Sequence, residues 1–132
     1  MRIAVASRDG KTVTGHIGKC PHWIIFEVTQ SDTDEPVVTE VERITLPKAL
    51  IFHYYKDEQP HPLKICHAVI GASAGENFKH KMQQRGMEAI MTAESDPKQA
   101  ALDYVRHTIT PPKPRPIGEL VCKVRDVFSE RK

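Results

Sequence analysis

The chain has 132 residues, of which 39% are hydrophobic, 27% charged and 6% aromatic, a composition typical of one globular domain. Its net charge of +2 is too small to predict binding to nucleic acid or to a membrane surface. No apolar run reaches the roughly 18 residues that cross a bilayer, and the N-terminal segment becomes polar at Arg8, too early for a secretory signal. We therefore expect a cytoplasmic protein, and its three cysteines, none in a CxxC pair, predict free thiols.

The first part of the chain predicts an antiparallel run of strands. Residues 3–7 form a short apolar segment, and residues 23–28 are typical of a strand buried on both faces. Alternation over residues 37–42 predicts a half-exposed strand, with residues 32–36 as the hairpin loop before it. Residues 47–56 are compatible with either a helix or a strand.

The next part of the chain predicts alternating strands and helices. Residues 67–71 form a buried strand, and the apolar spacing that follows predicts a helix over residues 74–85, ended by Gly86. Residues 87–91 form another strand, after which Asp96 is placed to cap a second helix. Strands first and strand–helix pairs afterwards predict a single three-layer α/β domain with about five strands.

The last 25 residues differ from the rest. Residues 110–116 are rich in proline, and residues 117–132 carry apolar side chains at helical spacing. We therefore divide the chain into an α/β domain at residues 1–107 and a proline-rich linker with a C-terminal helix at residues 108–132. This segment has a net charge of +3. It would fold back on the domain or on a partner subunit, which leaves a homodimer open, or would serve as a phosphate-binding arm.

The loop between the first two predicted strands gathers groups that bind soft metals. His16, Cys20 and His22 lie close together in a segment whose glycines and proline would let the loop direct all three at one point. Thiolate and imidazole suit zinc, copper, iron and iron–sulfur clusters, and Lys19 would offset the charge of an anionic cluster. The alternative is that Cys20 is a small buried hydrophobe and His22 a surface residue.

A second loop, residues 52–67, contains His53, His61, Cys66 and His67. Ligands on separate loops, without a second fixed ligand pair, argue against a closed structural zinc site. An open, exchangeable metal site fits this pattern better.

Residues 71–75 match G-x-S-x-G between a predicted strand and a predicted helix, the setting of a hydrolase nucleophile. Either Asp96 or Asp103, followed by His107, would complete the order of a triad, but Asp103 and His107 are spaced to pair with each other on a helix surface. Ser73 also begins an S-x-x-E pattern, which predicts a capping role for its hydroxyl. The N–H groups around Ser73 and Gly75 would then form a cradle for an anionic cofactor.

Taken in order, these motifs resemble the dinitrogenase iron-molybdenum cofactor biosynthesis family, which includes NifX, NafY and the C-terminal part of NifB. The resemblance covers residues 1–107. The segments that carry it are residues 1–7, 13–20, 26–28, 68–71, 75–78, 86–89 and 100–104.

The resemblance implies an RNase H-like mixed sheet flanked by helices and a non-enzymatic role. A member would bind an iron–sulfur or iron–molybdenum cluster, or a precursor, and carry it transiently between cofactor-assembly proteins and apo-dinitrogenase. The family's cluster-binding histidine maps onto His16, with Cys20 as the nearby thiol and His22 as a further candidate. The loop with His53 and His61 would rim the pocket. Ile17 departs from the family, in which an aromatic residue is commoner at this position.

Two other functions remain as alternatives. The same fold would serve as a metal-free module that binds a small anionic ligand or a protein at residues 73–77. A hydrolase using Ser73 is the less favoured alternative. A nuclease would need several converging carboxylates, and only Asp9 and Glu27 lie near the first strands.

Overall fold

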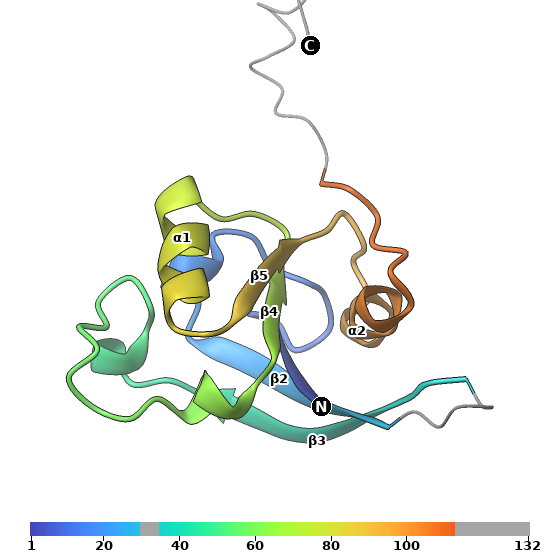
Figure 1. Ribbon diagram of the computed structural model, residues 1–132, viewed down its shortest axis with the longest axis horizontal. Coiled ribbons are helices and arrows are strands. Elements are labelled where there is room, and N and C mark those ends of the chain that lie inside the picture. Colours follow the sequence, from blue (N-terminus) through green and yellow to red (C-terminus); the bar gives the residue numbers. More distant parts are fainter. Residues whose placement is uncertain (30–34, 113–132) are drawn as a thin grey trace, which may run out of the picture.

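The computed structural model describes residues 1–29 and 35–112 (Figure 1). Its core is one five-stranded sheet in the order β3-β2-β1-β4-β5. The strands are β1 Arg2–Ala6, β2 His22–Thr29, β3 Val37–Thr45, β4 Ala68–Gly71 and β5 Glu88–Met91. The first three pair antiparallel, whereas β4 lies parallel to both β1 and β5. The predicted mixed α/β sheet is confirmed.

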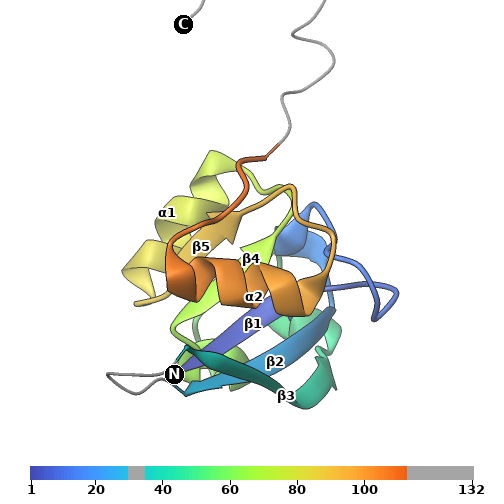
Figure 2. The same cartoon turned by 90° about the vertical axis from the view of Figure 1, so that its right-hand side faces the viewer.

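Two helices cover opposite faces of this sheet (Figures 1 and 2). They are α1 Glu76–Gln84 and α2 Pro97–Arg106. Because side chains alternate along a strand, β1 contributes Ala4 to the core beneath α1 and Ile3 and Val5 to the core beneath α2. These two cores explain why β1 is apolar at consecutive positions. The domain therefore has the three layers that the sequence predicts.

The start of α2 and the end of α1 are each set by a residue next to the helix in the sequence. The Asp96 side chain accepts a hydrogen bond from the Gln99 N–H at 3.0 Å, which confirms the predicted cap of α2. Gly86 follows α1 with a φ of 84°, and the Met87 N–H donates to the Met82 carbonyl at 2.9 Å. This left-handed turn lets the chain leave α1 and enter β5.

Three sequence predictions are wrong in detail. α1 begins after Gly75, so the Ser73 hydroxyl does not cap it. Asp103 is buried and accepts from the Gln99 side chain at 2.8 Å, so no surface pair with His107 forms. Residues 47–56 contain only the short 3-10 helix η2 Lys48–Leu50 before a series of turns.

Some predicted features fall outside the described residues. These are most of the expected hairpin loop at residues 32–36 and the C-terminal helix in residues 117–132. The chain entering the proline-rich segment is fixed at Thr110, whose carbonyl accepts from the Ala93 N–H at 3.1 Å. Across the described part of the chain, no helix is long and apolar enough to span a membrane.

Candidate functional site

An open cavity of about 760 Å³ lies on the α1 side of the sheet. It is bounded by the loop after β1, the loop after β3, the turn after β4 and one side of α1. Its lining is cationic, imidazole, aromatic or small, and comprises Arg8, His16, Gly18, Lys19, Phe52, His53, Ser73, Ala74, Gly75, Asn77, Phe78, Lys81 and Arg85. Four sequence-predicted site residues therefore meet here, namely His16, His53, Ser73 and Gly75.

The loop that carries His16 is held against the turn after β4. The His16 N–H donates to the Ser73 hydroxyl at 2.9 Å, and the Ile17 N–H donates to the Ser73 carbonyl at 3.1 Å. Glycine is needed for this approach, because a Cβ at Gly15 would lie 2.7 Å from the Ser73 oxygen and one at Gly71 only 1.9 Å from Ile17 Cγ2. Backbone packing thus fixes His16 at the edge of the cavity.

His16 itself adopts a left-handed conformation, with φ and ψ both 51°. This region is uncommon for residues other than glycine and costs about 1 kcal/mol or more. The side chain is exposed, so burial of the ring does not offset that cost. Strain of this kind concentrates at binding sites, which makes His16 the strongest ligand candidate in the cavity.

His53 reaches the same cavity from the loop after β3. Its backbone N–H donates to the Gly18 carbonyl at 2.7 Å, which ties this loop to the one that carries His16. The exposed imidazole lies edge-on to the Tyr54 ring, with 4.9 Å between the ring centroids. A ligand in the cavity can therefore contact imidazoles from two separate loops.

The N-terminus of α1 supplies backbone donors to the cavity. Within the described residues, the N–H groups of Gly75, Glu76 and Asn77 have no hydrogen-bond acceptor. A helix N-terminus also carries partial positive charge, so this end of α1 favours an anion. A Cβ at Gly75 would meet nothing within 4 Å, which leaves the space beside these groups open.

The charged side chains around the cavity are all basic. Arg8, Lys19, Lys81 and Arg85 line it, and no carboxylate among the described residues does so. Only Arg85 is neutralised by a close carboxylate, since Arg8, Lys19 and Lys81 form no ion pair within the described residues. The positive charge of the lining therefore favours an anionic ligand over a cationic one.

The side chains of Cys20 and His22 do not line the cavity. The Cys20 side chain is 0% exposed, its thiol donates to the His22 carbonyl at 3.2 Å, and burial raises the thiol pKa. His22 Nδ1 lies 3.0 Å from the Thr45 hydroxyl, and the residue lines a smaller pocket near β3. The structure thus does not bring the predicted thiol ligand to His16.

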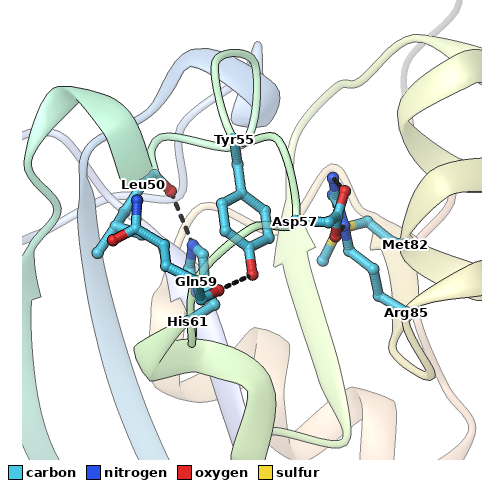
Figure 3. Close-up of polar contacts among 7 residues, drawn as sticks. All are labelled: Leu50, Tyr55, Asp57, Gln59, His61, Met82 and Arg85. Atoms are coloured by element: carbon cyan, nitrogen blue, oxygen red, sulfur yellow. Dashed lines mark hydrogen bonds and ion pairs between the residues drawn. The ribbon is translucent and has the colours of Figure 1, made fainter.

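His61 is buried and has a structural role (Figure 3). Its Nε2 lies 2.7 Å from the Leu50 carbonyl, and its Nδ1 accepts from the Leu63 N–H at 3.1 Å, so both ring nitrogens are engaged. The ring stacks on Phe52 with 4.4 Å between centroids, and burial lowers the pKa of the imidazole. In the same region, burial raises the pKa of Cys66 to about 11. Neither side chain lines the cavity.

The geometry gives Ser73 a structural contact and no triad partner. Its hydroxyl accepts from the His16 N–H, whereas His107 lies at the C-terminal end of α2, on the opposite face of the sheet (Figure 1). A hydrolase centred on Ser73 therefore has no general base from His107. The serine instead positions the loop that carries His16.

Replacing Ser73 with alanine is expected to destabilise the domain by about 1 kcal/mol, because the His16 N–H loses its acceptor. Urea unfolding followed by circular dichroism measures this loss. S95A is the matched control, since Ser95 is exposed and its hydroxyl makes no hydrogen bond within the described residues. Equal stability of S73A and S95A would show that the hydroxyl does not hold the loop.

Sequence reasoning concentrated on histidine and cysteine, and it missed the cavity residues Arg8, Phe78, Lys81 and Arg85. Lys81 and Arg85 follow Asn77, the last residue of the predicted anion-binding turn, at intervals of four residues, and Phe78 lies beside them on the same side of α1. This spacing places cationic groups on the helix face that continues from that turn. The sequence around Arg8 has no comparable spacing that would predict its place in the cavity.

Fold and cavity together define a three-layer α/β domain with a mixed five-stranded sheet and an open cavity whose charged lining is basic. The model of the family described as Dinitrogenase iron-molybdenum cofactor matches residues 1–107, and the chain belongs to this family. Membership of this family indicates involvement in dinitrogenase iron–molybdenum cofactor biosynthesis. No curated protein is similar enough in sequence to count as a relative.

Two solved structures share the fold. The crystal structure of PH0822 is 14% identical, with a TM-score of 0.55, and the match covers 83% of this chain and 94% of that one. The NMR structure of a candidate NifB protein from Thermotoga, of the DUF35 family, is 15% identical, with a TM-score of 0.50 and coverage of 87% and 97%. At these identities the likeness concerns the fold alone.

Proposed function

We propose that this protein binds an anionic iron–sulfur or iron–molybdenum cluster, or a precursor of one, and delivers it to another protein without catalysing a reaction. The donor and recipient would be cofactor-assembly proteins and apo-dinitrogenase. Membership of the iron–molybdenum cofactor family supports this role. The cluster is cargo, and the cavity on the α1 side of the sheet is its proposed binding site.

One observation carries the proposal: an exposed, strained His16 stands at a cavity whose charged lining is entirely basic. Imidazole is a suitable ligand for iron, and an anionic cluster is stabilised by Arg8, Lys19 and Lys81 and by the free N–H groups at the start of α1. His53 is the second candidate ligand. Cys20 is left out because its thiol is buried and hydrogen-bonded.

A carrier must also release its cargo. Within residues 1–29 and 35–112, no group of three or more His, Cys, Asp or Glu side chains is placed to hold a metal ion. One or two imidazoles in an open cavity suit exchange better than a closed cage of four ligands. The surrounding cations would hold the cluster by charge, which a recipient with stronger ligands can overcome.

Anaerobic reconstitution with iron and sulfide tests the proposal directly. We expect protein-bound iron and sulfide-to-iron charge-transfer absorbance that remain with the protein through gel filtration. Negligible bound iron under these conditions, combined with binding of inorganic phosphate at residues 73–77, would favour the metal-free anion-binding module instead.

The basic side chains of the cavity lead to a separate prediction about the strength of cluster binding. K19Q combined with K81Q is expected to weaken cluster binding about 30-fold at low ionic strength, since each removes roughly 1 kcal/mol of screened attraction and about 1.4 kcal/mol corresponds to a factor of ten. The difference should shrink as salt is added. Lys98 supplies the matched control, because it is exposed on α2 at the other face of the sheet. Binding unchanged by the paired substitution would contradict the electrostatic role of the cavity.

A further inference from the structure

Asp57 and Arg85, both drawn in Figure 3, form an ion pair at the edge of the cavity, which Arg85 lines. Arg85 ends α1, and its Nε and one terminal nitrogen donate to the two Asp57 oxygens at 2.7 and 2.9 Å. The Arg85 side chain is only 8% exposed, whereas that of Asp57 is 51% exposed. The arginine is therefore nearly buried and its partner reaches into solvent.

Arg85 has more donors than Asp57 uses. Its other terminal nitrogen makes one weak contact, at 3.5 Å to Met82 Sδ, and the remaining N–H groups have no acceptor among the described residues. The guanidinium also lies over the Phe52 and Tyr55 rings, at 5.6 and 5.0 Å from their centroids. A nearly buried cation with free donors thus faces the cavity.

Asp57 lies behind this cation, outside the main cavity. It lines a second, smaller cavity of about 320 Å³ together with Lys64, Lys81, Gln84 and Arg85. Lys81 and Arg85 border both cavities, so the carboxylate lies close to two of the cations that an anionic ligand would use. Its backbone has a φ of 62°, a conformation that aspartate tolerates better than most residues.

We propose that Asp57 is an internal counter-anion that lowers the affinity of the cavity for anionic cargo by competing with it for Arg85. This inference rests on the proposed function, because it concerns the same cavity. With Asp57 in place, the field of Arg85 is largely neutralised, and the cargo is held weakly enough to be transferred. Arg85 is then the cation that sets how tightly an anion binds.

The alternative role of the pair is purely structural. In that case Asp57 and Arg85 only fasten the segment after β3, which carries Phe52 and His53, to the end of α1. Loss of either partner would then loosen the wall of the cavity and weaken anion binding. The two roles therefore predict opposite signs for neutralisation of Asp57.

Titration of the full chain with inorganic pyrophosphate, without metal, separates the two roles. Chemical shifts of the Gly75, Glu76 and Asn77 amides report binding inside the cavity. We expect D57N to lower the dissociation constant about three- to tenfold, and R85Q to raise it by a similar factor, as for single charges near a protein surface. R85K, which keeps the charge, should bind more tightly than R85Q.

E40Q is the matched control for D57N. It also removes one carboxylate from an arginine pair, since Glu40 binds Arg43 at 2.7 Å, but it does so on β3, away from the cavity. Weaker pyrophosphate binding by D57N, or binding equal to that of E40Q, would overturn the proposal. Iron reconstitution of the wild-type chain is read separately, so the cluster-carrier function can fail while this comparison still decides the role of Asp57.

Discussion

Replacing His16 with alanine is expected to reduce cluster binding by at least about 10- to 100-fold, a loss that even an outer hydrogen-bond partner of a metal ligand can cause. The reason is geometric: His16 is the exposed imidazole that the loop after β1 holds at the cavity in a strained conformation. H53A is expected to have a smaller effect. Iron per chain after anaerobic reconstitution and gel filtration measures the loss.

Replacing His16 with glycine separates loss of the cluster ligand from destabilisation of the fold. H16G relieves the positive φ of 51° and should stabilise the loop by about 1 kcal/mol, yet it should lose as much cluster as H16A. H22A is the control for removal of a nearby imidazole, since His22 lies at a different pocket. Full iron occupancy in an H16A/H53A double variant would exclude both histidines as ligands.

The order of strands and helices could be predicted because each element carries its own signal. The apolar run of β1 reflects burial on both faces, and the Asp96 side chain that caps α2 lies three residues from the Gln99 N–H that donates to it. Residues 47–56 lack such a signal. Their turns depend on contacts distant in sequence, such as Phe52 against His61 and against Trp23. The spacing of apolar residues within one segment does not predict turns that are stabilised by contacts with other segments.

Ser73 illustrates a second limit. Its S-x-x-E pattern predicts a cap, but the hydroxyl is engaged by the His16 N–H, which is 57 positions away in the chain. The helix then starts after Gly75 and keeps free N–H groups facing the cavity. A long-range hydrogen bond thus takes the place of the local one, and the turn that we predict to bind an anion keeps its N–H groups free.

The sequence predicted the residue types at the candidate site, but not the direction in which each side chain points. His16 and Cys20 are four residues apart, and spacing alone cannot tell that the thiol points into the core beneath α1. The Trp23 indole donates to the Cys20 carbonyl at 3.0 Å, which fixes the loop in that orientation. His61 is similar, since its two ring nitrogens satisfy backbone groups of neighbouring turns.

Substituting alanine for Gly71 is expected to destabilise the domain by about 3 kcal/mol, the upper end of the usual cost of overpacking a core. The added Cβ would lie 1.9 Å from Ile17 Cγ2, and both Gly71, at the end of β4, and Ile17, in the loop after β1, are buried. Neither β4 nor the loop that carries Ile17 can shift to relieve the clash without breaking hydrogen bonds, so such a shift would itself be destabilising. Urea unfolding measures the change, with G75A as control because its Cβ would meet nothing within 4 Å.

The same substitution also tests whether the fold positions the ligand. If Ile17 is displaced, its N–H loses the Ser73 carbonyl, and His16 loses its place at the cavity. G71A should therefore bind less iron even at temperatures where it is fully folded. Truncating Ile17 to alanine removes the clashing methyl, so I17A should cost about 1 kcal/mol less in the G71A background than in the wild type. Additive effects of the two substitutions would mean that the contact between Gly71 and Ile17 does not set the position of His16.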